Sequence, residues 1–147
     1  MDPAPVACAI VAGLALATSV LGTFLPWLKS GDANRNSYAT VGVLERLLDI
    51  HGVVRLAIDL WPFLSLYCAA SIALLALMWW RVAAAAGAVS GVICVVVSWR
   101  ALSVPGRFNV AVVRSGPMVT LIGAGVAVVA LASLLVIVSV HRIRSHR

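Results

Sequence analysis

Four apolar runs constrain the fold of this chain more than any other feature of its sequence. They cover about residues 5–27, 61–79, 82–99 and 117–140. A helix needs about 20 mostly apolar residues to cross the ~30 Å hydrocarbon core of a bilayer. As one helix, residues 61–99 would be about 58 Å long, so we expect the sequence "WWR" at 79–81 to mark a turn between two spans. The pattern predicts an all-α membrane protein with a four-transmembrane-helix bundle.

The composition supports this interpretation. Hydrophobic residues make up 63% of the 147 residues and charged residues 11%. Soluble domains have about 45–50% apolar residues and about 25% charged residues. A soluble fold of this length could not bury so much apolar surface. We therefore expect residues 1–147 to form a single integral membrane domain. The net charge of +6 comes from basic residues at the ends of the apolar runs, where membrane proteins carry them, so no nucleic-acid partner is expected.

The two polar segments on one side of the predicted bundle, 28–60 and 100–116, have the patterns of short folded elements. Residues 28–41 contain the turn-rich "GDANRN", which predicts a β-hairpin. Residues 107–113 lie between two Gly/Pro breaks. Phe108, Val110 and Val112 alternate there with Asn109 and Ala111, a period of two that is typical of a strand. We expect this strand to join the hairpin in a small extracytoplasmic β/amphipathic-helix cap.

The helix of this cap is predicted over residues 42–51, where Leu44 and Leu48 share an apolar face. In the predicted strand 107–113, Phe108 is an apolar residue that we also assign to the cap. Aromatic residues and prolines near the span ends complete the predicted interface. They are Pro26 and the five tryptophans, Trp27, Trp61, Trp79, Trp80 and Trp99, all expected to act as interfacial anchors.

The charge distribution leaves the orientation open. Seven Lys/Arg lie in the segments that join spans one to two and three to four, which favours a cytoplasmic position for these loops: Lys29, Arg35, Arg46, Arg55, Arg100, Arg107 and Arg114. The other side of the predicted bundle carries four arginines. Three of them, Arg142, Arg144 and Arg147, directly follow the fourth span. Such a tail is typical of a cytoplasmic anchor on anionic lipid.

The interiors of the predicted spans contain no Asp, Glu, Lys, Arg or His. Proton relays and ion sites in membranes depend on such residues, so a proton-coupled transporter and an embedded acid–base enzyme are not expected. Nucleotide, zinc and calcium motifs are absent from the sequence, and the cysteines are isolated. We predict no catalytic residue, no cofactor and no metal. An interfacial enzyme using Asp49, His51 and Asp59 is the weakest alternative.

Small residues four apart predict close helix contacts. They are Gly13 and Ala17 in the first span, Gly87 and Gly91 in the third, and Gly123 and Ala127 in the fourth. Packing within the bundle and docking of a partner helix both remain open.

Two motifs carry a family resemblance. "FLPWLKSG" after the first span and "SGPMVTLIGAG" at the start of the fourth resemble small four-helix integral membrane proteins of actinobacteria. They are distantly similar to the tryptophan-associated transmembrane proteins. The matching positions are Leu25, Pro26, Trp27, Gly31, Gly116, Pro117 and Gly123. The resemblance implies a multi-pass protein of the cell inner (plasma) membrane with cytoplasmic N- and C-termini and a folded first loop outside. The layout is claudin-like, but the claudin Gly-Leu-Trp and paired-cysteine signature is missing.

These observations lead to a functional hypothesis. We expect a non-enzymatic accessory or scaffolding subunit of a cell-envelope membrane complex, with the lipid bilayer and other membrane proteins as partners. The alternative is an oligomeric lipid-handling or small-molecule channel or transport protein, with a pore lined by Ser and Thr.

Overall fold

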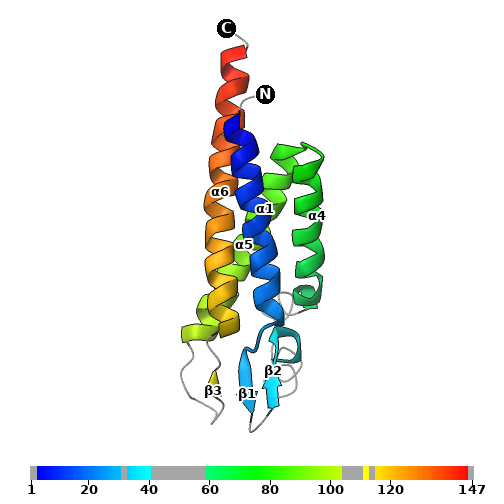
Figure 1. Cartoon of the computed structure of the whole chain (residues 1–147), viewed down its shortest axis with the longest axis vertical. Helices are drawn as coiled ribbons and strands as arrows, with labels where there is room; N and C mark the ends of the chain where they lie inside the picture. The colour runs from blue at the N-terminus through cyan, green and yellow to red at the C-terminus, as the bar shows by residue number, and fades with distance from the viewer. Residues whose placement is uncertain (1–2, 31–32, 41–58, 104–110, 113–114, 146–147) are drawn as a thin grey trace.

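The structure is a bundle of antiparallel helices with a small sheet at one end (Figure 1). It is a computed structural model that describes residues 3–30, 33–40, 59–103, 111–112 and 115–145. The long elements are α1 (Pro3–Phe24), α4 (Leu64–Ala76), α5 (Trp80–Ser103) and α6 (Ser115–Ser145), and the 3-10 turn η1 (Trp61–Phe63) leads into α4. Both chain termini lie at the end of the bundle opposite the strands.

Three helical segments are long and apolar enough to cross a membrane, namely Pro3–Phe24, Trp80–Leu102 and Ser115–Val140. The other apolar segment, Trp61–Ala76, is shorter, and its 16 residues would extend about 24 Å as an α-helix. Large apolar side chains are exposed on every helix, which suits a protein surrounded by lipid. The chain is thus a multi-pass membrane protein by helix length and composition.

The turn between α4 and α5 lies at residues 77–79, earlier than the predicted break at "WWR". Met78 takes a left-handed conformation with φ 61°. The N–H of Trp79 donates to the carbonyl of Leu74 at 3.0 Å and that of Met78 to Leu75 at 3.1 Å, a Schellman arrangement that ends α4. Glycine is the usual residue in this left-handed position. Because the chain has methionine there instead, the sequence lacks the glycine that would mark the end of α4. Trp80 and Arg81 already belong to α5.

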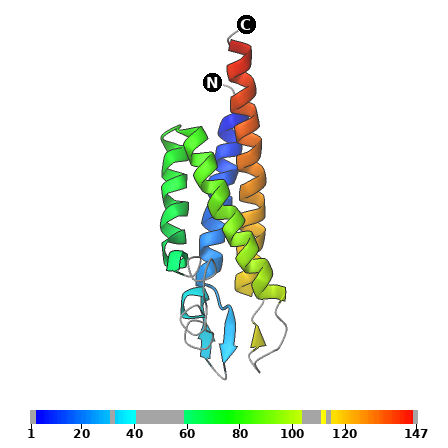
Figure 2. The same ribbon diagram turned by 180° about the vertical axis from the view of Figure 1, so that it is seen from behind.

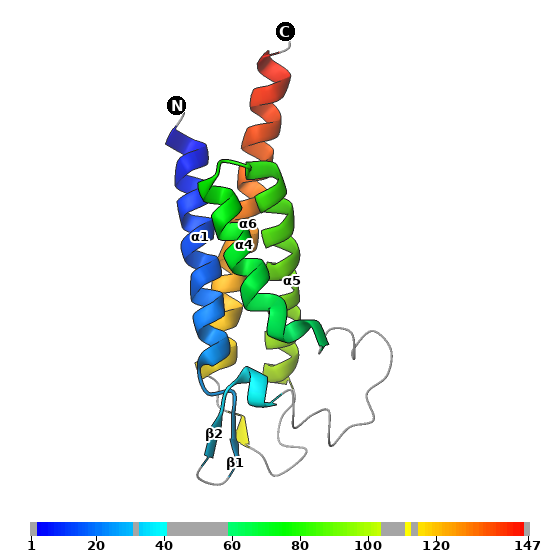
Figure 3. The same ribbon diagram turned by 90° about the vertical axis from the view of Figure 1, so that its right-hand side faces the viewer.

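The sheet has the strand order β2-β1-β3 and is antiparallel throughout. β1 (Leu28–Ser30) pairs with β2 (Ala33–Arg35) and, on its other side, with β3 (Ala111–Val112). Two loops that are far apart in the sequence therefore meet below the end of α1 (Figure 3). Of the predicted strand 107–113, the described part is 111–112. Leu44, Leu48, Phe108 and the predicted helix 42–51 lie outside the described residues.

The bundle core is built largely from small side chains, with α1 packed against α6. A Cβ on Gly22 would meet the backbone nitrogen of Thr120 at 2.6 Å, and one on Gly123 would meet the backbone nitrogen of Ser19 at 2.8 Å. Glycine at these positions lets the two backbones approach closely. Figure 2 shows α5 crossing the bundle obliquely, from α4 at one end towards α6 at the other.

Candidate functional site

The residues Leu25-Pro26-Trp27 connect α1 to the sheet. The indole of Trp27 folds back on α1 and donates from Nε1 to the carbonyl of Gly22 at 2.9 Å, and its side chain is 4% exposed. The backbone N–H of Trp27 donates to the carbonyl of Arg35 at 2.8 Å. One residue therefore binds both the end of α1 and the end of β2.

Trp61 packs against Trp27 from the start of α4. The two rings are 5.8 Å apart between centroids and meet edge to face at 72°, a favourable arrangement for aromatic pairs. Trp61 Nε1 donates to Ser37 Oγ at 3.2 Å, and Ser37 Oγ donates to the carbonyl of Thr23 at 2.7 Å. Ser37 is buried and lies in a helical turn, residues 37–40, whose Ala39 N–H is capped by Asn36 Oδ1.

The first turn of α6 closes this arrangement. The N–H of Gly116 donates to the carbonyl of Pro26 at 3.2 Å. A Cβ on Gly116 would overlap the indole of Trp27, with Nε1 at 2.6 Å and the Pro26 carbonyl oxygen at 2.8 Å. The two sequence motifs that carry the family resemblance are thus in direct contact. We call Trp27, Ser37, Trp61 and Gly116 the tryptophan joint.

The tryptophan joint corrects the prediction that all five tryptophans act as interfacial anchors. Trp27 and Trp61 are 4% and 3% exposed, so they are buried in the protein and do not face lipid headgroups. Trp79 and Trp99 are exposed, at 64% and 63%, and their anchoring at a membrane interface stays a prediction. Nearby, Phe24 and Tyr38 pack with their ring centroids 5.4 Å apart. Sequence reasoning missed the role of Ser37, because a single serine in a loop gives no signal of a buried partner.

The small-residue positions divide into two groups. Gly87, Gly91, Gly123 and Ala127 all lie inside the bundle: a Cβ on Gly87 would meet Leu131, one on Gly91 would meet Val128, and Ala127 is fully buried. In the first span, by contrast, Ala17 is exposed and a Cβ on Gly13 would have no atom within 4 Å. Packing within the bundle is therefore wrong for Gly13 and Ala17, whose docking to a partner helix stays a prediction.

Five hydroxyl groups of the helices are bonded within their own helix, whereas the hydroxyl of Thr120 on α6 donates to the carbonyl of Ser19 on α1 at 3.4 Å. Thr18, Ser19, Ser71, Ser90 and Ser133 each donate to the carbonyl four residues earlier. Such bonds use the one donor of each hydroxyl, while its lone pairs can still accept. The donor of each of these five hydroxyls is therefore occupied inside its own helix.

Within the described ranges, no group of three or more His, Cys, Asp or Glu side chains could hold a metal ion. Cys68 and Cys94 are buried thiols in the core. Asp59 is exposed just before η1, while Asp49 and His51 lie outside the described residues, as does Arg147. Arg142 and Arg144 belong to the last turns of α6.

Replacing Ser37 with alanine should destabilise the protein by about 2–3 kcal/mol, because the change leaves the buried indole N–H of Trp61 and the carbonyl of Thr23 without a partner. SDS titration followed by circular dichroism measures this loss. The matched control is Thr18→Ala, which removes an exposed bond within one helix and should cost only a few tenths of a kcal/mol. Equal losses in the two variants would show that the Ser37 bridge contributes nothing.

Comparisons with protein family models, with curated proteins and with solved structures found no match to this chain.

Proposed function

We propose that this chain is a non-enzymatic, four-span accessory or scaffolding subunit of a cell-envelope membrane complex. The observation that carries the proposal is the tryptophan joint, which connects the sheet to one end of an apolar bundle through hydrogen bonds and ring contacts. Trp27, Ser37 and Trp61 are all buried and mutually bonded or stacked. The described part of the chain holds no metal cluster, so a presented surface is the simplest use of this arrangement.

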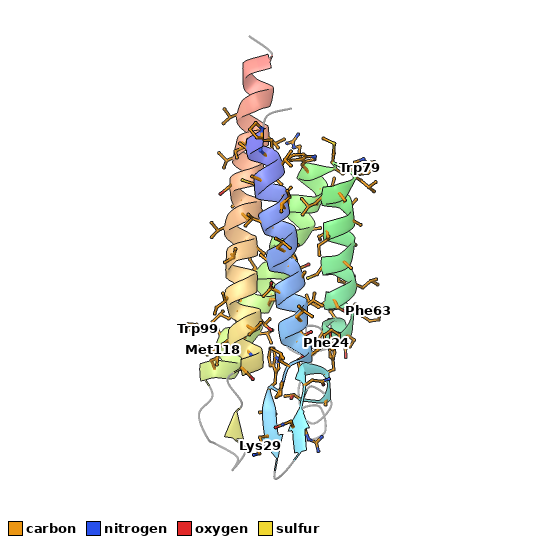
Figure 4. The ribbon with its side chains drawn as sticks, in the orientation of Figure 1. Phe24, Lys29, Phe63, Trp79, Trp99 and Met118 are labelled. Atoms are coloured by element: carbon orange, nitrogen blue, oxygen red, sulfur yellow. The ribbon has the colours of Figure 1, made fainter. Side chains whose placement is uncertain are left out.

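The exposed aromatic side chains support a fourth crossing by η1 and α4. Trp79 and Trp99 are both exposed and lie near opposite ends of the bundle (Figure 4). The 20 residues between them along α5 correspond to about 30 Å of helix, the thickness of the hydrocarbon core. Leu60 and Leu77 are exposed beyond the two ends of the short helix. They extend its apolar surface, which supports η1 and α4 as the fourth span of this proposal.

Four crossings put both termini on one side of the membrane, and we propose that this side is the cytoplasm. The sheet then forms the extracytoplasmic cap. Lys29 is exposed on β1, and Arg81 is exposed beside the α4–α5 turn at the other end. These two residues are therefore suitable reporters for opposite sides of the bilayer.

The topology test uses Lys29→Cys and Arg81→Cys in a background with Cys8, Cys68 and Cys94 replaced. In intact cells, a membrane-impermeant maleimide should label position 29, and position 81 should react only after permeabilisation. The reverse pattern would contradict the orientation. Labelling of both positions from the same side would contradict four crossings.

The sheet is the proposed contact surface for a partner protein. Asn34 on β2 is exposed, as is Lys29 on β1. A photo-crosslinking residue at position 34 should give a discrete adduct in native membranes, and the same adduct partner should co-purify in mild detergent. The control position is Val129, which is 67% exposed in the middle of α6 and faces lipid. Repeated recovery of the protein alone, without adducts at position 34, would contradict the proposal.

The alternative, an oligomeric pore or lipid-handling protein lined by hydroxyls, has less support. It requires polar groups free to face a solute, whereas five helix hydroxyls are bonded to their own backbone. Gly13 and Ala17 remain candidates for contact with a partner helix, because a Cβ on Gly13 would have no atom within 4 Å and Ala17 is exposed.

A further inference from the structure

Cys68 on α4 and Cys94 on α5 are far apart in the sequence, and the structure brings their side chains together. Their thiol groups form a side-chain hydrogen bond. Both cysteines are free thiols, and both are buried, with exposed fractions of 0% and 1%. The two thiols therefore meet inside the bundle, at the contact between α4 and α5.

The packing on either side of this pair agrees with the contact. Leu64, Cys68 and Ser71 are buried residues of α4, and their spacing puts them on one helix face. Leu64 belongs to the same core cluster as Cys94. An added Cβ on Gly87 would lie 3.6 Å from Ser71 Cβ. Gly87 and Cys94 are seven positions apart and so share a face of α5. The same two helix faces thus touch both before and after Cys68.

The pair lies towards the end of the bundle that carries the sheet. Cys94 is five residues before the exposed Trp99, which is about 8 Å along the helix axis. The cluster that contains Cys94 also contains Trp27 and Trp61 of the tryptophan joint. With the sheet outside the cell, as proposed above, the thiols lie on the side of the membrane where disulfides form and persist.

The helix α4 is also the element for which a covalent link has the largest use. It is the shortest of the four long helices, and Leu66 and Tyr67 on its outer side are exposed. In lipid, no hydrophobic force draws one apolar helix to another. A disulfide between two helices disfavours the state in which they separate, because it restricts the unfolded chain.

We propose that Cys68 and Cys94 form a disulfide that joins α4 to α5. The inference rests on the proposed orientation, because the oxidant is a thiol–disulfide oxidoreductase of the extracytoplasmic side that acts before the helices close over the thiols. The thiolate of one cysteine attacks the disulfide of the oxidant, which forms a mixed disulfide and releases one oxidant thiol. The thiolate of the other cysteine attacks the mixed disulfide and releases the second. Two electrons and two protons pass from the cysteines to the oxidant, whose disulfide becomes two thiols.

The number of free thiols in the protein from native membranes tests the pair. Cells are quenched with acid, and the full-length protein is dissolved in SDS with N-ethylmaleimide, which alkylates every free thiol. Intact mass spectrometry counts the maleimide adducts. The chain has three cysteines, so the wild type should carry one adduct, on Cys8, and three when a reductant precedes the maleimide.

Serine variants identify the partners. Cys68→Ser and Cys94→Ser should each carry two adducts with or without reductant, because the remaining partner is freed. Cys8→Ser is the matched control and should carry none without reductant and two with it. Three adducts on the unreduced wild type would overturn the proposal, and so would a disulfide-linked dimer on a non-reducing gel. Labelling of positions 29 and 81 reports the orientation separately, so three adducts on a protein with an extracytoplasmic sheet would reject the disulfide alone.

The link should also be measurable as stability. Reductant should lower the SDS concentration at which half of the wild-type protein is unfolded, and it should leave that concentration unchanged in Cys94→Ser. Equal values for the wild type with and without reductant would contradict a disulfide that holds α4 in place.

Discussion

Alanine at Gly123 is expected to destabilise the bundle by about 2 kcal/mol, the typical cost of overpacking a tight core. The new Cβ would lie 2.8 Å from the backbone nitrogen of Ser19 and 2.9 Å from the carbonyl oxygen of Ala15. Both are backbone atoms of α1, so no side chain can rotate away to make room. The helices α1 and α6 must move apart along the contact that holds the bundle together.

The matched control is Gly125→Ala, two residues further along the same helix. A Cβ there would have no atom within 4 Å, so the change should be neutral or should stabilise α6 by up to about 1 kcal/mol through helix propensity. SDS titration followed by circular dichroism compares the two variants directly. If Gly123→Ala is as stable as Gly125→Ala, the close contact between α1 and α6 does not exist.

Alanine at Gly116 should cost about 2–4 kcal/mol and should separate the sheet from the bundle. The added methyl group would overlap the indole of Trp27 and approach the Pro26 carbonyl oxygen at 2.8 Å. Moving the indole breaks its bond to Gly22 and its edge-to-face contact with Trp61. The expected cost combines overpacking with the loss of a buried hydrogen bond.

The signature of this variant is local. Near-ultraviolet circular dichroism should lose the signal of the Trp27–Trp61 pair, while far-ultraviolet helicity is kept in mild detergent. The control Ser115→Ala removes an exposed hydroxyl with one long bond of 3.4 Å to Pro26, and it should leave both spectra unchanged. An intact near-ultraviolet spectrum in Gly116→Ala would rule out the tryptophan joint as described.

Much of the candidate site was visible in the sequence as motifs, but its geometry was not. Pro26, Trp27 and Gly116 stand out as a proline, a tryptophan and a glycine at span ends, and the structure brings them into contact. Their meeting requires α1 and α6 to be neighbours, which no local pattern specifies. Ser37 gains its role from Thr23 and Trp61, which are 14 and 24 residues away in the chain.

The sequence by itself determined that this chain is a multi-pass membrane protein, because a bilayer core accepts long apolar helices and little else. The same principle explains why it could not determine which face of each helix turns inward. In water, an apolar stripe marks the buried face of a helix. In lipid, the outward face is apolar as well, and packing depends on the fit of small residues. Only the tertiary structure could therefore decide that Gly22 and Gly123 join α1 to α6, while Gly13 faces away from the core and Trp27 and Trp61 are buried.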